Sequence, residues 1–245
     1  MKIGVFDSGA GGLSVVKSLL AQNIFEEIIY YGDTARVPYG PKDQNTIIRY
    51  SLEALEFFNN FDIDLLITAC NTVSAYALSE MNSQSTYPVL GVIEPGVMAL
   101  ENSKLNKDDN ILIIATRATI NSKRYEMALE KLGHSNITSL QTGLFVPLVE
   151  EGIFSGELLY STMKHYFSDI KKPKAIILGC THFPLIGEAL LDYFNYEPLL
   201  IHSGEAIVEY LEAKYELKKR KKEANLKIFA SDNVSGLRKI ANIWL

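Results

Sequence analysis

Short apolar runs alternate with stretches of helical periodicity along most of the chain. The runs are rich in β-branched residues and end at turn residues, a pattern that predicts buried strands. These runs cover residues 2–6, 27–31, 65–68, 89–93, 111–115, 175–178 and 199–202. Apolar positions recur with helical spacing over residues 13–20, 46–59, 122–132, 157–167 and 206–215. A strand followed by a helix, several times over, predicts an α/β fold with mainly parallel sheets.

The chain also resembles itself at an offset of about 110 residues. Residues 67–72 match residues 177–182, so Cys70 and Cys180 occupy equivalent positions. The same offset relates the run that ends at Asp7 to the run that ends at Thr116, and residues 90–94 to residues 200–204. The repeat therefore predicts two similar halves.

The repeat further predicts two pseudosymmetric, doubly wound α/β domains that face each other across a central cleft. A length of 245 residues allows this, since a domain takes roughly 150 residues on average. We assign residues 1–95 and 207–245 to the first domain and residues 96–206 to the second. The last 40 or so residues have no counterpart in the repeat and are expected to pack back on the first half. Residues 102–110, rich in Asn, Lys and Asp, are the best linker candidate.

Composition narrows the class of protein. With 47% hydrophobic and 22% charged residues, the chain is globular and not intrinsically disordered. Its net charge of −5 disfavours nucleic acid and anionic membranes as partners. No apolar run reaches the roughly 18 residues of a membrane span, and the first residues do not resemble a signal peptide. Only two cysteines are present, in keeping with a reducing cytoplasm. A small-molecule partner inside the cell is expected.

The two equivalent cysteines are the strongest candidates for chemistry. Each follows a predicted strand and precedes hydroxyl or amide residues that open a helix, whose N-terminal amides lower a thiol pKa and hold an anion. Ligands of parallel sheets bind beyond these strand ends, so Cys70 and Cys180 are expected to oppose each other across a ligand. Three alternatives remain: buried structural thiols, a zinc site at Cys180 and His182 without the usual paired ligand spacing, and a catalytic disulfide without a Cys-x-x-Cys pair.

Three further segments frame the thiols. Residues 7–14 form a glycine-rich turn that enters a helix, where exposed amides can hold a carboxylate or phosphate; the third glycine of a dinucleotide fingerprint is absent. Residues 31–41 are turn-rich and aperiodic, which is typical of a binding loop. Glu150 and Glu151 offer carboxylates, one of which can orient His182. The basic residues 214–222 lie among Glu212, Glu216 and Glu223 and are predicted to form a solvated helix face.

Four segments together resemble one enzyme family. They read IGVFDSGAGG at residues 3–12, YGDTARVPYG at 31–40, ACNTVSA at 69–75 and LGCTHFPL at 178–185. In this order they closely resemble the bacterial glutamate racemases of the aspartate/glutamate racemase family, over nearly the whole chain. The resemblance implies an isomerase that interconverts L- and D-glutamate, the latter for peptidoglycan synthesis. It also implies that no cofactor or metal is used, and that the enzyme is a cytoplasmic homodimer.

Racemisation by proton transfer needs one base and one acid on opposite faces of Cα, which two thiols provide. By resemblance, Cys70 would deprotonate D-glutamate with Asp7 nearby. Cys180 would deprotonate L-glutamate with His182, itself oriented by Glu150. The same carry-over gives the substrate-binding residues Ser8, Tyr39, Gly40, Asn71, Thr72, Thr116, Thr119 and Thr181. Two alternatives stay open: a racemase acting on aspartate or another acidic or cyclic substrate, and a non-enzymatic two-domain binding protein.

Overall fold

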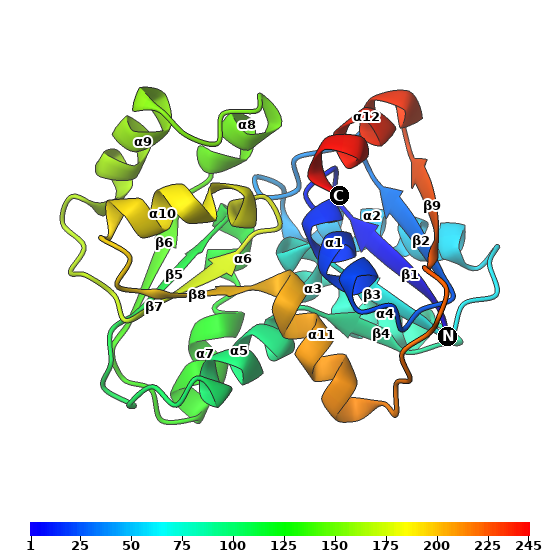
Figure 1. The fold of residues 1–245 in the computed structure, drawn as a ribbon, viewed down its shortest axis with the longest axis horizontal. Coiled ribbons are helices and arrows are strands. Elements are labelled where there is room, and N and C mark those ends of the chain that lie inside the picture. The colour runs from blue at the N-terminus through cyan, green and yellow to red at the C-terminus, as the bar shows by residue number, and fades with distance from the viewer.

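A computed structural model describes residues 1–245, and its ribbon has two lobes, each built on one β-sheet with helices against it (Figure 1). The strands are β1 (Lys2–Asp7), β2 (Glu27–Gly32), β3 (Leu65–Thr68), β4 (Val89–Gly91), β5 (Ile111–Ala115), β6 (Ile137–Gln141), β7 (Ala175–Gly179), β8 (Leu199–His202) and β9 (Asn225–Ala230). The helices are α1 (Leu13–Ala21), α2 (Gln44–Phe58), α3 (Asn71–Tyr76), α4 (Leu78–Gln84), α5 (Ile93–Asn102), α6 (Arg117–Asn121), α7 (Arg124–Lys131), α8 (Phe145–Glu150), α9 (Glu157–Phe167), the 3-10 helix η1 (Phe183–Ile186), α10 (Gly187–Tyr193), α11 (Ser203–Lys214) and α12 (Val234–Trp244).

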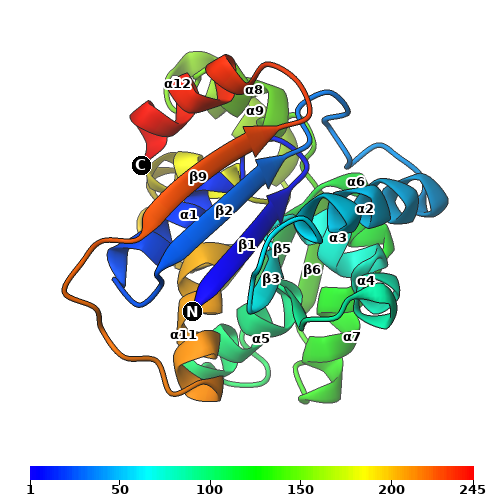
Figure 2. The same ribbon diagram turned by 90° about the vertical axis from the view of Figure 1, so that its right-hand side faces the viewer.

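The two sheets repeat one strand order. The first runs β4-β3-β1-β2-β9 and the second runs β8-β7-β5-β6, with every neighbouring pair parallel. Each strand from β1 to β4 therefore has a counterpart from β5 to β8, and β9 is an addition at the edge of the first sheet (Figure 2). The prediction of two α/β domains with parallel sheets is confirmed.

Strand β6 is the one member of the repeat that the apolar pattern missed. Its sequence ITSLQ is half polar, and none of its residues is fully buried because it is the edge of the second sheet. An edge strand lacks the continuous apolar run of a central parallel strand. The repeat itself contains the missing signal, because residues 137–141 lie 110 positions after the start of β2 at Glu27.

Three predicted elements need correction. The strand expected over residues 89–93 ends at Gly91 because α5 begins at Ile93. The helix expected over 122–132 is α7, which begins only at Arg124 because Lys123 has a left-handed φ of 54°. The solvated helix expected over 214–222 is absent: α11 ends at Lys214, and Tyr215 has extended backbone (φ −127°, ψ 141°).

The C-terminal segment returns to the first sheet. Strand β9 pairs with β2 from Asn225 to Ala230, and α12 packs against α1, where the Lys17 ammonium donates to the carbonyl of Trp244 over 2.9 Å. Both chain ends therefore lie in the lobe of the first sheet (Figure 1). The domain boundaries at residues 95/96 and 206/207 stay a prediction.

One apolar cluster of 36 buried residues runs through both domains. It joins β1 and β3 side chains such as Val5 and Ile67 to β5 and β7 side chains such as Leu112 and Ile176. Helix α11 packs on both α1 and α5 and bridges the lobes. The two sheets thus share this apolar cluster, while two separate clusters of 16 and 9 buried residues complete the core. None of the helices combines the length and apolar character needed to cross a lipid bilayer.

Gly4 gives a test of how tightly the first sheet is packed. A Cβ at this position would lie 2.7 Å from the buried Phe58 ring and 2.9 Å from Leu66. We expect Gly4→Ala to lower the free energy of unfolding by about 1–3 kcal/mol, because a packed core resists added volume. Gly143→Ala is the control, since nothing lies within 4 Å of its Cβ. Equal stability of both variants in urea titrations would contradict the packing argument.

Candidate active site

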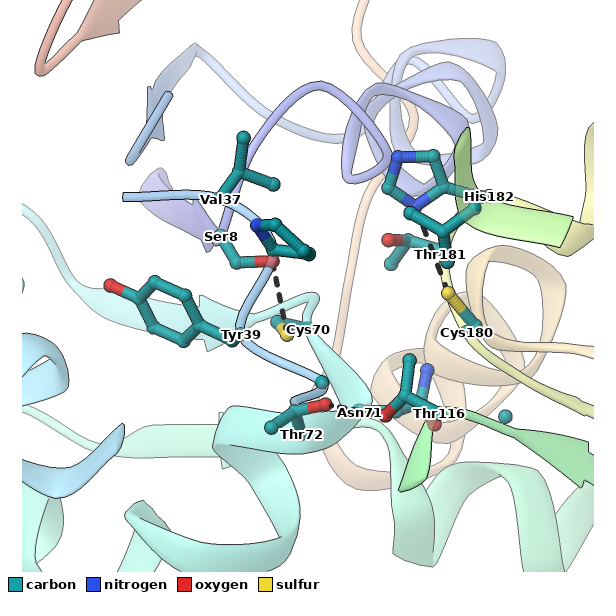
Figure 3. Close-up of a pocket in the computed structure, with 14 residues that line it drawn as sticks. Ser8, Val37, Tyr39, Cys70, Asn71, Thr72, Thr116, Cys180, Thr181 and His182 are labelled. Carbon is teal, nitrogen blue, oxygen red and sulfur yellow. Dashed lines mark hydrogen bonds between the residues drawn. The ribbon is translucent and has the colours of Figure 1, made fainter. Parts of the chain in front are cut away.

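The two cysteines stand at matching ends of the two sheets. Cys70 lies between β3 and α3, and Cys180 follows β7 directly. Strands β3 and β7 occupy the same position in their sheets, next to β1 and β5. The carboxyl ends of parallel strands lie at the same edge of a sheet. Cys70 therefore lies near the residues that follow β1, and Cys180 lies near those that follow β5. Figure 3 shows the two thiols on opposite sides of one pocket.

One cavity collects most of the predicted site residues. Those that line it are Ser8, Tyr39, Gly40, Cys70, Asn71, Thr72, Thr116, Cys180, Thr181 and His182. The remaining three lie one contact behind: Asp7 accepts from Thr181, Glu150 binds His182, and Thr119 pairs with Thr72 and Thr116. No lysine or arginine lines the cavity. Its volume of about 20 Å³ holds about one water, so an amino acid enters only if the walls separate.

Cys70 has an environment that favours the neutral thiol. Its Sγ lies 3.5 Å from Ser8 Oγ, and the residue is buried. Burial raises the pKa of the Cys70 thiol to about 12, with the nearby Asp7 charge acting in the same direction. The thiol therefore keeps its proton at neutral pH.

Cys180 has a basic neighbour instead. Its Sγ lies 3.7 Å from Nδ1 of His182, whose Nε2 lies 3.2 Å from Oε1 of Glu150. Burial lowers the pKa of His182. The hydrogen bonds to Cys180 and Glu150 and the charge of Asp7 outweigh this effect of burial and raise the pKa of His182 to about 10. An imidazolium at this distance is a counterion for a thiolate on Cys180. The two thiols thus have different electrostatic surroundings.

Asp7 ties the two domains together beside the cavity. Its carboxylate is fully buried and accepts from the Gly9 amide over 2.9 Å and from the Thr181 hydroxyl over 3.2 Å. Burial raises the pKa of Asp7. The turn between β1 and α1 approaches the second domain so closely that a Cβ on Gly11 would collide with Thr181 and His182. A glycine is required at that point of the turn.

The loop between β2 and α2 closes the cavity from the first domain. Tyr39 lines the cavity, but its hydroxyl donates to the buried carboxylate of Asp33 and points away from the thiols (Figure 3). Only its backbone and ring edge can face a ligand. Gly40 abuts the second domain, because a Cβ there would lie 2.6 Å from Thr116 Cβ. The Gly40 carbonyl accepts from the Ala118 amide over 3.0 Å.

Neutral donors form the floor of the cavity. The hydroxyls of Thr72, Thr116 and Thr119 lie 3.0–3.2 Å from one another. The Asn71 amide is held by residues distant in the chain: its Oδ1 accepts from the Tyr125 hydroxyl over 2.7 Å, and its Nδ2 donates to Ser203 Oγ over 3.2 Å. Such hydroxyl and amide groups suit an uncharged pocket for a carboxylate ligand.

Several residues of the site were missed by sequence reasoning. Val37, Pro38, Val146 and Gly179 also line the cavity, and all four lie within or beside the segments that were singled out. Arg117 lies in a neighbouring depression of about 510 Å³ that shares Pro38, Gly40, Thr116 and Val146 with the cavity and also contains Glu150. Nothing in the sequence pattern marks Tyr125 and Ser203 as site residues, because their role depends on their hydrogen bonds to Asn71.

Neither the metal nor the disulfide alternative has support in the geometry. No group of three or more His, Cys, Asp or Glu side chains is arranged to hold a metal ion. Both cysteines are free and buried, so they are not joined as a disulfide.

Known proteins are similar to this chain in sequence and in fold. The family model for Asp/Glu/Hydantoin racemase matches residues 3–211. Glutamate racemase from a Nitratiruptor species is 61% identical over 245 residues, covering 100% of this chain and 96% of that protein. The crystal structure of glutamate racemase from Campylobacter jejuni subsp. jejuni superposes with a TM-score of 0.99 at 55% identity, covering 100% of this chain and 98% of that one. The structure of glutamate racemase from Francisella tularensis subsp. tularensis in complex with D-glutamate gives a TM-score of 0.87 at 34% identity, covering 100% and 93%.

The protonated state of His182 predicts a pH-dependent stability. Its folded pKa of about 10 exceeds the usual 6.5, so its contribution is complete below pH 6.5 and is lost as pH rises through 10. We expect the difference in unfolding free energy between the wild type and His182→Asn to shrink by at most about 1.4 kcal/mol per pH unit across this window. Urea titrations at several pH values measure it.

The exposed His165 supplies the matched control, because His165→Asn should show no such trend. A difference between wild type and His182→Asn that is constant from pH 6.5 to 10 would mean that His182 is neutral in the folded protein.

Proposed function

The chain belongs to the Asp/Glu/Hydantoin racemase family and is an amino-acid racemase, and we propose that it interconverts L- and D-glutamate by proton transfer between Cys70 and Cys180. One observation carries the mechanism: two thiols from equivalent strand ends of two domains line a single cavity. The substrate rests on the close relatives named glutamate racemase, one of them a complex with D-glutamate.

The reaction needs no net change of protons. One cysteine, as thiolate, removes the Cα proton from one face, and the electron pair left behind is delocalised toward the α-carboxylate. The other cysteine, as thiol, delivers its proton to the opposite face. After turnover the protonation states of the two sulfurs are exchanged, and the reverse reaction uses the same two groups in opposite roles.

We propose a resting state from the unequal surroundings of the two thiols. Cys70 is a neutral thiol, because burial holds its pKa at about 12, and Cys180 has the His182 imidazolium as counterion. This state has its base at Cys180 and its acid at Cys70, which by family resemblance is the form that acts on L-glutamate. In the other direction, a thiolate on Cys70 beside Asp7 forms rarely but is a strong base, since basicity rises with pKa.

Neutral donors are proposed to bind the substrate. The hydroxyls of Ser8, Thr72 and Thr181 and the Asn71 amide line the cavity, and Thr116 and Thr119 extend the hydroxyl group from the second domain. A lysine or arginine beside the sulfurs would stabilise a thiolate and weaken it as a base. The absence of both residue types from the cavity wall is consistent with acid–base use of the thiols.

The wider role follows from the family resemblance. We propose that the enzyme works without cofactor or metal, as a cytoplasmic homodimer, and that its D-glutamate enters peptidoglycan synthesis. The tests must distinguish this function from two alternatives. The first rival is a racemase for aspartate or another acidic substrate, and the second is a binding protein without catalysis.

Exchange in D₂O tests the reaction. The purified protein is incubated with L-glutamate in D₂O without added cofactor or metal, while NMR follows the Cα proton and polarimetry follows the optical rotation. We expect deuterium at Cα and decay of the rotation to zero. Exchange with retained rotation contradicts two-base transfer. Exchange with aspartate but not glutamate favours the first rival, and binding without exchange favours the second.

Single substitutions test the two thiols. We expect Cys70→Ser and Cys180→Ser each to lower kcat by at least about 10²-fold, because a serine hydroxyl is far too weak an acid and its anion is not formed near neutral pH. The thermal midpoint should change little, since serine is nearly isosteric with cysteine. Near-wild-type turnover in either variant would rule out the two-cysteine mechanism.

A further inference from the structure

Tyr125 is a buried residue of the second domain that touches both cysteine loops. It belongs to the first turn of α7, and its side chain is 3% exposed. Its hydroxyl donates to Oδ1 of Asn71, the residue after Cys70. Its ring lies beside Gly179, the residue before Cys180, since a Cβ on that glycine would be 3.5 Å from the ring. One side chain thus spans the two loops that carry the thiols.

Two glycines flank this ring, at distances where a Cβ would be in van der Waals contact with it. A Cβ on Gly96 of α5 would lie 3.4 Å from the Tyr125 hydroxyl, and a Cβ on Gly179 would also lie 2.8 Å from that of Ala115. The phenol is therefore enclosed on both sides and has little freedom to rotate away from Asn71. Packing holds its hydroxyl in place.

The hydrogen bond determines which way the Asn71 amide faces. Asn71 Oδ1 is the partner of the Tyr125 hydroxyl, and Ser203 Oγ accepts from Asn71 Nδ2. A flipped amide would turn Nδ2 toward the phenol and leave the phenolic hydrogen without an acceptor, which is unfavourable in a buried site. Burial raises the pKa of Tyr125, so the hydroxyl stays a donor.

With the amide fixed, one Asn71 N–H is left for a ligand in the cavity that Asn71 lines. An amide carries two N–H donors, and Ser203 uses one of them. Asn71 is 2% exposed and lines the cavity, in a floor that otherwise consists of hydroxyls (Figure 3). A carboxylate needs donors, and a flipped Asn71 would present its carbonyl oxygen to it instead.

We propose that Tyr125 is a positioning residue for the racemase: it orients the Asn71 amide so that an N–H faces the substrate carboxylate, and it braces the two cysteine loops from the second domain. This role rests on the proposed function, because it assumes an acidic amino acid in the cavity. Tyr125 acts through Asn71 and does not touch the reacting atoms.

Tyr125→Phe removes only the hydroxyl and keeps the ring. We expect KM for both glutamate enantiomers to rise about tenfold with kcat changed less than about twofold, because substrate and transition state lose the same oriented donor. Tyr87→Phe is the matched control: its hydroxyl also donates to an asparagine Oδ1, that of Asn59, over 3.1 Å and outside the cavity. This control should leave KM unchanged.

A double-mutant cycle tests the path of the effect. If Tyr125 acts through Asn71, Tyr125→Phe should raise KM no further in an Asn71→Ala background. Thermal midpoints accompany each measurement, since a merely structural tyrosine would lower the midpoint and leave KM unchanged.

The outcomes separate this role from the proposed function. A wild type that racemises glutamate, with Tyr125→Phe raising KM only when Asn71 is present, supports the positioning role. An active wild type in which Tyr125→Phe behaves like Tyr87→Phe, or raises KM equally without Asn71, overturns that role alone. A wild type that does not racemise glutamate overturns both.

Discussion

The close approach of the turn after β1 to the loop after β7 is the contact on which the site depends. Across the domain interface, Asp7 accepts a hydrogen bond from the Thr181 hydroxyl, and the Ser14 hydroxyl donates to the Thr181 carbonyl over 2.8 Å. At Gly11 there is no room for a side chain. This contact fixes Cys180 relative to the first domain. Without it, two equivalent strand ends would face each other but would not enclose a cavity that holds only about one water.

The scaffold is symmetric, but the electrostatics are not. Equivalent strand order places both cysteines at the carboxyl ends of corresponding strands, although Cys70 precedes α3 directly and Cys180 precedes a turn and η1. Each thiol has a charged neighbour that the other lacks. The first domain supplies Asp7, whose buried charge opposes ionisation of Cys70, and the second supplies His182, whose positive charge faces Cys180. A reversible two-base enzyme requires this kind of division, since one sulfur must hold a proton while the other lacks it.

The sequence predicted the fold and the placement of Cys70 and Cys180 at equivalent strand ends, because both depend on local pattern. Apolar runs marked the central strands, and the similar residues around Cys70 and Cys180 were enough to equate the two positions. Edge strand β6 was not predicted, because a half-polar strand carries little periodic signal. Tyr125 was not predicted as a site residue for another reason. Its position on an apolar helix face is typical of a core residue, and only the packing of α7 against the Cys70 loop gives its hydroxyl a partner. Contacts between domains leave no trace in a single sequence.

The size of the cavity indicates where the molecule must open. A volume of about 20 Å³ cannot admit glutamate, yet the shared core of 36 buried residues holds the domains together along their length. The contacts between the loop that closes the cavity and the second domain are weaker than this core. There the loop between β2 and α2 meets α6 through the Ala118–Gly40 hydrogen bond and the Arg117 guanidinium on the Pro41 carbonyl. Separating these few polar contacts costs far less than exposing the core, because water replaces each of them. Of the contacts that close the cavity, those between this loop and α6 are therefore the ones that separate at the lowest cost.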